Sequence, residues 1–164
     1  MKTGEIIRVI VISLVGALLM FLVQPFIYKQ GWMGKDPDLA DPLAALESWA
    51  NGSYMVAAGV VFGVSVICTI FWCAMAAKSK AHRPDELRGW SLAWWILGLF
   101  PVLSIGPAIG FFNPIAGLRL SLALFFVLDI LILFWLPTAS STPGLLIYTP
   151  PFAHPLRDLI DRFF

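Results

Sequence analysis

The sequence predicts an all-α integral membrane protein, a four-transmembrane-helix bundle followed by a short amphipathic C-terminal helix. Its 164 residues are 59% hydrophobic and only 13% charged, whereas soluble domains carry roughly 25% charged residues. The mean hydropathy is +0.84. Eleven basic residues against ten acidic ones leave a net charge of +1. This balance excludes a strongly basic nucleic-acid binder, and the apolar content excludes a disordered chain.

Four apolar runs are each long enough to cross a bilayer, which takes roughly 20 helical residues. They cover about residues 6–28, 54–77, 90–112 and 115–136. In lipid each segment has to satisfy its own backbone hydrogen bonds, so these runs are expected to be helices. Residues 1–136 then form the membrane domain, and residues 137–164 form a proline-rich cytoplasmic tail.

The distribution of basic residues predicts the orientation. The N-terminus, the loop between the second and third runs, and the tail carry two, four and two Lys or Arg residues, eight of the eleven. The positive-inside rule then places both termini in the cytoplasm. The first run is longer than a signal-peptide core of roughly 7–15 residues, so we expect an uncleaved anchor. We expect a multi-pass protein of a cell inner membrane, with a thylakoid or other organelle membrane as the alternative.

A short helix is expected in the loop between the first two runs, over about residues 42–50. Asp41 is placed to cap it, Pro42 fits its first position, and Asn51-Gly52 predicts its end. We expect three of its apolar residues to rest on the membrane surface: Leu43, Leu46, and either Trp49 or Ala50.

Prolines and glycines within the runs suggest how the helices bend and pack. Pro101 and Pro107 lie inside the third run, where each removes a backbone donor, so a kink is expected there. The kink could also serve as a gating hinge. Two small-xxx-small pairs are expected to let the second and third helices approach each other: Gly59 with Gly63, and Gly106 with Gly110.

Asp129 is the one acidic residue deep within a run. A charged carboxylate near the bilayer centre is unfavourable by about 2.5–3.5 kcal/mol, so we expect a buried and mostly neutral side chain. Three roles are open. Asp129 could be a neutral group bonded to Ser65, Thr69, Ser104 or a Trp of a neighbouring helix. It could pair with a basic residue of another subunit, or it could relay a proton or a cation.

No pattern in the sequence predicts an enzyme, a metal site or a bound cofactor. Cys68 and Cys73 lie about 140° apart on a helix, which suits neither a disulfide nor a shared metal. His82 and His154 lack further ligands at metal-binding spacing. No His lies inside a run to ligate haem. Nucleophile-elbow, zinc-protease and P-loop motifs are all absent from the sequence.

The tail contains an irregular segment and then a helix. Pro and Thr residues after Pro137 predict irregular structure up to about residue 154. Residues 155–164 alternate between a charged and an apolar face, which is typical of an amphipathic helix. We expect its apolar face to dock on the inner membrane surface or on a partner through Leu156, Leu159, Ile160 and Phe163.

These observations favour a non-enzymatic accessory, assembly or scaffold subunit of a larger membrane protein complex. The expected partners are membrane lipids and other integral membrane subunits, and no nucleic acid. Asp129 and the tail would both be easier to satisfy with a partner. The alternative is a small transporter or channel subunit that uses Asp129 and a kinked third helix.

The orientation can be tested by labelling single cysteines. A cysteine at position 40 should react with an impermeant reagent from outside the cell, and one at position 81 only after permeabilisation. The reverse pattern would contradict the orientation and leave the number of spans unchanged.

Overall fold

Four long apolar helices make up most of the structure. The computed structural model describes residues 3–33, 41–79, 86–112 and 116–163, without the side chains of residues 112, 116 and 160–163. All regular structure in this part of the chain is helical. Four helices are long and apolar enough to cross a membrane: Thr3–Lys29, Pro42–Lys78, Leu87–Phe111 and Arg119–Ser141. The prediction of four apolar helices is confirmed, and the result is consistent with a multi-pass membrane protein.

Two of these long helices are interrupted by a π-helical turn. The first consists of α1 (Thr3–Leu18), the π segment η1 (Leu19–Val23) and α2 (Gln24–Lys29). The fourth consists of α6 (Arg119–Ile130), the π segment η4 (Leu131–Trp135) and α7 (Leu136–Ser141). The remaining helices are α3 (Pro42–Asn51), α4 (Ser53–Lys78), α5 (Leu87–Phe112), the 3₁₀ turns η3 (Ala116–Leu118) and η5 (Gly144–Tyr148), and α8 (Ala153–Phe163).

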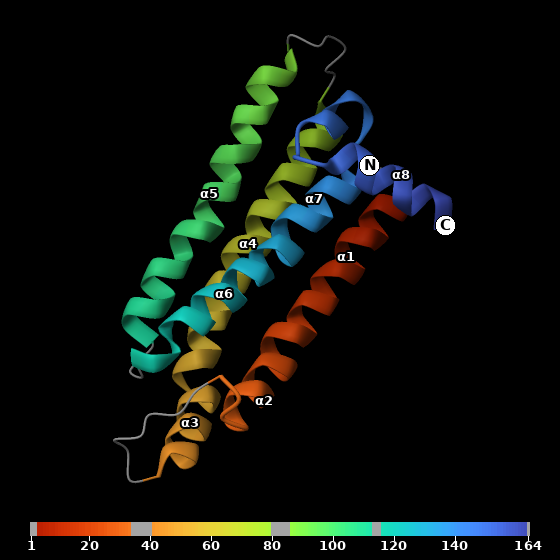
Figure 1. The fold of residues 1–164 in the computed structure, drawn as a ribbon. Helices are drawn as coiled ribbons and strands as arrows, with labels where there is room; N and C mark the ends of the chain where they lie inside the picture. Colours follow the sequence, from red (N-terminus) through yellow and green to blue (C-terminus); the bar gives the residue numbers. More distant parts are fainter. Residues whose placement is uncertain (1–2, 34–40, 80–85, 113–115, 164) are drawn as a thin grey trace.

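The four long helices run alternately up and down, so the first and last helices α1 and α8 meet at one end of the bundle (Figure 1). Helix α4 is central and contacts η1, α5, α6, η4 and α7. Helix α1 packs along η4 and α7 on one side, and α5 packs against α4 and α6 on the other. Helix α8 crosses the end of the bundle beside α1 and α7 (Figure 1).

Each π segment ends next to a proline that cannot donate a hydrogen bond. Before Pro25, the Gln24 N–H bonds to the Leu19 carbonyl five residues back, which leaves the Met20 carbonyl without a donor from its own helix. The Tyr54 hydroxyl of α4 donates to that carbonyl at 2.8 Å. The structure therefore supplies from a second helix the hydrogen bond that the proline removes.

A similar arrangement occurs in the fourth helix, one residue closer to the proline. The Leu136 N–H bonds to the Leu131 carbonyl, and Pro137 has no N–H to offer to the carbonyls of Ile132 and Leu133, five and four residues before it. Thr69 of α4 donates its hydroxyl to that carbonyl at 2.7 Å. Both interrupted helices are thus held to α4 at the point of interruption.

The fourth helix continues past the predicted boundary. We expected irregular structure after Pro137, but helix α7 extends to Ser141. The π segment accommodates the proline, and the Thr138 hydroxyl donates back to the Phe134 carbonyl at 2.8 Å. The Thr142 hydroxyl likewise donates to the Thr138 carbonyl. The prediction was wrong here because a hydroxyl-rich sequence can satisfy helical carbonyls as well as turns.

The short helix α3 forms as predicted but packs differently. Asp41 accepts a hydrogen bond from the Ala44 N–H at 3.2 Å, which confirms the N-cap. Leu46 and Trp49 are buried, with exposed fractions of 1% and 5%, because α3 packs against α2 and α4. Only Leu43 remains exposed. The expectation that this face rests on a membrane surface is therefore corrected to contact with the protein.

The two glycine pairs do not bring α4 and α5 together. A Cβ atom added at Gly59, Gly63, Gly106 or Gly110 would meet nothing within 4 Å. The prediction that these pairs let the second and third helices approach is therefore corrected: they leave open space beside the chain. Helices of this chain instead approach closely at two other glycines, Gly16 against Leu133 and Gly98 against Phe134.

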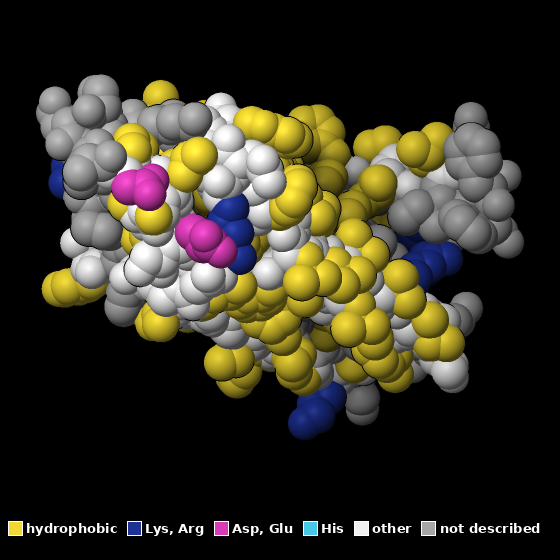
Figure 2. Space-filling model, turned by 90° about the horizontal axis from the view of Figure 1, so that it is seen from below, with side chains coloured by type: hydrophobic (Ala, Val, Ile, Leu, Met, Phe, Trp, Pro, Cys, Tyr) yellow, Lys and Arg dark blue, Asp and Glu magenta, His cyan; other side chains and the backbone are white. Residues whose placement is uncertain are grey.

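Helix α5 passes without a break through Pro101 and Pro107. The Ser104 hydroxyl donates to the Pro101 carbonyl at 2.6 Å. The expected kink stays a prediction. Large apolar side chains cover the outer flanks of the bundle, as Figure 2 shows from the end that carries α3.

Gly16 should be intolerant of a larger side chain. Gly16→Val would push its Cβ into the fully buried Leu133, and overpacking of this kind lowers the free energy of unfolding by about 1–3 kcal/mol. Reversible unfolding in mixed micelles would measure the loss. The matched control is Gly4→Val in the same helix, where a Cβ meets nothing within 4 Å. Equal losses in the two variants would contradict this packing.

Candidate functional site

Asp129 lies at the middle of the fourth long helix. That helix runs from Arg119 to Ser141, so its centre is residue 130, about 1.5 Å along the axis from Asp129. The Asp129 side chain is fully buried, with an exposed fraction of 0%. The expectation that it faces protein is confirmed.

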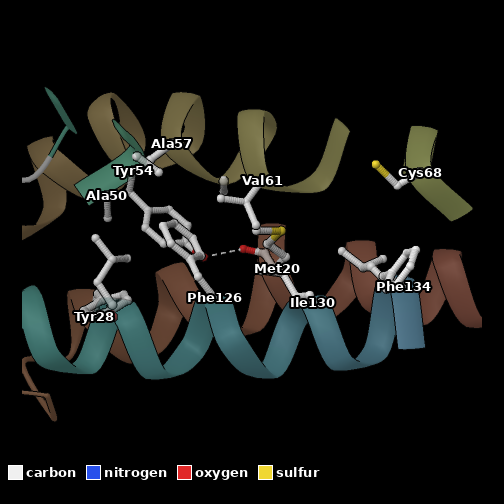
Figure 3. Packing of buried hydrophobic residues seen from close by; sticks show 14 of the residues in the cluster. Met20, Tyr28, Ala50, Tyr54, Ala57, Val61, Cys68, Phe126, Ile130 and Phe134 are labelled. Atoms are coloured by element: carbon white, nitrogen blue, oxygen red, sulfur yellow. Dashed lines mark hydrogen bonds between the residues drawn. The ribbon is translucent and has the colours of Figure 1, made fainter. Parts of the chain in front are cut away.

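The side chain that meets Asp129 comes from the first helix. Gln24 Nε2 donates a hydrogen bond of 2.7 Å to Asp129 Oδ1, and Gln24 Oε1 lies 2.7 Å from Tyr54 Oη. The same Tyr54 oxygen lies 2.8 Å from the Met20 carbonyl oxygen. Figure 3 shows this last contact among the buried side chains between the helices. We call these four groups the Asp129 network.

The network can be fully bonded only in certain protonation states. Tyr54 has one hydroxyl hydrogen for two acceptors, Gln24 Oε1 and the Met20 carbonyl. A half-turn of the Gln24 amide exchanges its oxygen and nitrogen without changing its shape. A protonated Asp129 then donates to Gln24, Gln24 donates to Tyr54, and Tyr54 donates to Met20. Each acceptor along the path, Gln24 Oε1, the Tyr54 oxygen and the Met20 carbonyl, then receives one hydrogen bond.

The second carboxyl oxygen supports the same assignment. Asp129 Oδ2 is buried and has no hydrogen-bond partner within the described part of the chain. An unbonded neutral oxygen in such a place is much less unfavourable than an unbonded charge. We therefore expect a neutral Asp129. Chemically, the network can hold and release one proton.

Aromatic rings enclose the network on the side toward α3. The Tyr54 ring stacks on Phe126 with centroids 6.3 Å apart and lies 5.6 Å from Tyr28. Trp49 of α3 packs edge-on against Tyr28 at 5.1 Å. These edge and stacked contacts are the arrangements that aromatic pairs favour. The rings therefore help exclude water from the network at this end.

Sequence reasoning missed the partner of Asp129. Three of the expected partners bond elsewhere: Ser65 donates to the Val61 carbonyl, Thr69 to the Leu133 carbonyl and Ser104 to the Pro101 carbonyl. The signal that was overlooked is Gln24, an amide inside the first apolar run. An amide at that depth also needs a polar partner, which Asp129 provides.

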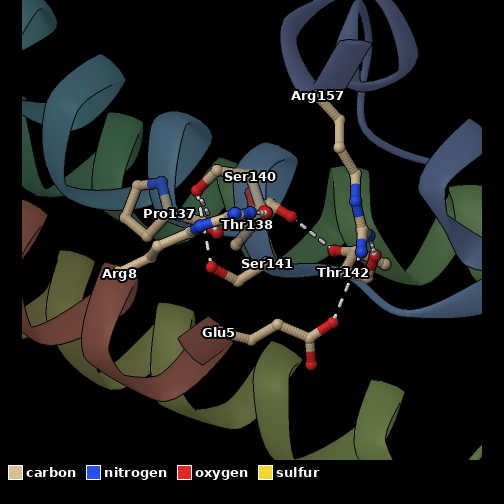
Figure 4. A network of polar contacts seen from close by, with 8 residues as sticks. All are labelled: Glu5, Arg8, Pro137, Thr138, Ser140, Ser141, Thr142 and Arg157. Carbon is tan, nitrogen blue, oxygen red and sulfur yellow. Dashed lines mark hydrogen bonds and ion pairs between the residues drawn. The ribbon is translucent and has the colours of Figure 1, made fainter. Parts of the chain in front are cut away.

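A second polar cluster lies at the end of the bundle away from α3, where α1 and α8 meet (Figure 1), and Figure 4 shows its side chains. Glu5 is buried, with 6% exposure, and its carboxylate lies 3.6 Å from the Arg157 guanidinium of α8. Arg157 also donates to the Thr142 carbonyl at 3.0 Å. Arg8 donates to the Ser140 carbonyl at 3.4 Å. We call this group the terminal cluster.

The terminal cluster changes the interpretation of the tail. Helix α8 spans Ala153–Phe163, so the predicted C-terminal helix is confirmed. Its Arg157 points at the bundle, whereas Leu159 is 52% exposed and Leu156 is half-buried. The side chains of Ile160 and Phe163 lie outside the described residues. The tail is thus held by its own chain, and docking on a partner stays a prediction.

The remaining candidate residues show no assembled site. Cys68 and Cys73 are both buried and carry free thiols. His154 lies 3.1 Å from Asp158, its neighbour one turn along α8. Among the described residues, no group of three or more His, Cys, Asp or Glu side chains could hold a metal ion. His82 lies outside the described residues.

Two substitutions of Asp129 test whether the fold needs a hydrogen-bonding group at this position. Asp129→Asn keeps both an N–H donor and a carbonyl acceptor, so it can bond to Gln24 in either orientation of the Gln24 amide. It should leave the free energy of unfolding nearly unchanged. Asp129→Leu leaves the Gln24 amide unbonded and should lower it by about 0.6–1.7 kcal/mol, the range for intramembrane hydrogen bonds. Unfolding in mixed micelles would measure both. Leu128→Ala, at an exposed neighbouring position, serves as the control. A larger loss for Asn than for Leu would contradict the neutral network.

Comparisons with known proteins add no relative from which a role could be carried over. No protein-family model, no curated protein and no solved structure matches the chain. The features that bear on its function are therefore the Asp129 network, the terminal cluster and the outward helix faces.

Proposed function

We propose that the chain is a non-enzymatic accessory or scaffold subunit that binds other integral membrane proteins through the outward face of α4. One observation carries this proposal. Gly59 and Gly63 lie beside open space, and the flanking Val56 and Val60 are 51% and 40% exposed. A pair of small residues one turn apart lets another helix approach closely, and no helix in the described part of the chain occupies the space.

The residues around the glycines favour such packing energetically. The exposed valines beside the glycines are Val56 and Val60, whereas Val64 packs against the core of the chain itself. Valine on a helix is almost confined to one side-chain rotamer, so it loses little entropy when a second helix packs against it. Between helices in lipid, close packing is the main source of attraction. The face therefore combines close approach with a low entropic cost.

The proposal assigns partner binding to a different part of the chain than the sequence suggested. Asp129 bonds to Gln24 and Arg157 of the tail meets Glu5, so both have partners within the chain. Neither needs another subunit to satisfy it. The open glycine face of α4 is a surface that a second protein can still cover.

Purification in mild detergent tests the proposal directly. The full chain should co-purify with larger membrane proteins in fixed stoichiometry, and Gly63→Leu should abolish this by filling the space that the partner occupies. Gly89→Leu is the matched control, since Gly89 also meets nothing within 4 Å but lies on α5. Co-purification that is unaffected by Gly63→Leu would contradict the α4 face. A chain that runs alone, or only with copies of itself, would contradict the subunit role.

A second candidate function is a small transporter or channel subunit. The observation that favours it is Asp129 Oδ2, a fully buried oxygen with no described partner at the middle of a long apolar helix. Intramembrane carboxyls often mark proton or ion pathways. Loss of flux in vesicles for an intact, well-assembled Asp129→Asn variant would favour this function over the subunit role.

A further inference from the structure

An apolar groove of about 570 Å³ lies between α5 and the π segment η4. Its floor consists of buried residues, Trp94, Ile130 and Phe134. Gly98 makes this floor possible, because a Cβ at that position would come within 2.9 Å of Phe134 Cε1. The rim is exposed and is formed by Trp95, Leu99, Val102, Leu131 and Phe152.

The groove offers its occupant carbon surfaces. The Trp94 indole N–H donates to the Thr138 hydroxyl at 3.1 Å. The Trp135 indole N–H donates to the Pro151 carbonyl at 2.9 Å. Both indoles therefore use their polar atoms within the protein and turn ring surface toward the groove. Such a lining favours a hydrocarbon chain over a polar ligand.

Phe152 borders the groove in an unusual backbone conformation. Its φ is +59°, in the left-handed region that non-glycine residues rarely adopt. Its side chain is 77% exposed, although it lies beside the Trp135–Pro151 hydrogen bond that anchors the segment. The backbone thus accepts strain while it holds a large apolar ring at the rim, where a bound chain would cover it.

A positive charge lies on the same face of α5. Arg88 precedes Trp95 by seven residues, which is two turns, so Arg88, Trp95, Leu99 and Val102 share one side of the helix. Arg88 is exposed and lies about 10 Å along the axis from Trp95. That direction leads to the end of the bundle that carries α8 (Figure 1). Lys78, at the end of α4, is exposed at this end as well.

We infer that the groove binds one acyl chain of an anionic phospholipid, with the headgroup held near Arg88. The apolar lining of the groove suits the acyl chain. Arg88, about 10 Å from Trp95 toward the end of the bundle, suits the phosphate of the headgroup. A neutral lipid would satisfy only the first of these two features. This site shares no residue with the glycine face of α4, so lipid binding in the groove does not depend on the proposed subunit role.

Photocrosslinking of the full chain in nanodiscs tests the inference. The probes are two phospholipids with the same diazirine-bearing acyl chain, one with a phosphatidylglycerol and one with a phosphatidylcholine headgroup. Crosslinks should concentrate in residues 94–102, 130–135 and 151–152. The glycerol lipid should label these residues about fivefold more than the choline lipid, the effect of one basic side chain near an anionic headgroup.

Matched variants separate the groove from general lipid contact. Val102→Trp should fill the groove and reduce labelling, whereas Leu103→Trp, at a 60% exposed position outside the groove, should not. Arg88→Gln should remove the headgroup preference, and Arg119→Gln, at the other end of the bundle, should leave it intact. Labelling spread evenly over all exposed faces would overturn the inference. Equal labelling by the two lipids in the unmodified chain would overturn it as well.

Discussion

The rest of the structure depends on two buried carbonyls that need a hydrogen-bond donor. Each lies one helical turn before a proline, which has no N–H to give it. Pro25 and Pro137 each follow a π segment, and neither can donate to the helix that precedes it. In apolar surroundings an unbonded carbonyl is strongly unfavourable, so each needs a donor from elsewhere. Helix α4 provides both, through Tyr54 to the Met20 carbonyl and Thr69 to the Leu133 carbonyl. The first and fourth helices are thereby fixed to the same central helix at defined heights.

The number of long helices and the burial of Asp129 could be predicted, because they depend only on the length of the apolar runs and on the polarity of one side chain. Four runs of about 20 apolar residues can be counted in the sequence, and the burial of Asp129 follows from the free energy of a charge in an apolar medium. The partner of Asp129 could not be predicted, because it depends on how the first and fourth long helices bring α2 and α6 together. Gln24 and Asp129 are separated by 105 positions, and no periodicity connects them.

Local sequence patterns gave wrong predictions where a side chain is compatible with two different local structures. Hydroxyl residues after Pro137 are typical of turns, yet Thr138 and Thr142 bond back to helical carbonyls and prolong the helix. The tail is amphipathic, and amphipathic helices usually turn their apolar side to the protein. Here the buried Glu5 carboxylate attracts Arg157, so this charged residue of α8 faces the bundle, whereas Asp158 and Leu159 are exposed. The decisive residue lies at the other terminus, beyond the reach of any local pattern.

Apolar content alone does not show which side of a long apolar helix packs against the rest of its chain, and α4 is an example. Both of its sides are apolar, but its bonding groups Tyr54, Thr69 and Trp72 recur at helical spacing on one side and all donate inward. Gly59, Val60 and Gly63 lie on the opposite side, at the angle a helix of 3.6 residues per turn requires. One side of α4 therefore donates hydrogen bonds to polar groups within its own bundle. None of these hydrogen bonds uses the glycine side, and a Cβ atom at Gly59 or Gly63 would meet nothing within 4 Å. The glycine side is therefore left open, and a second helix can pack against it.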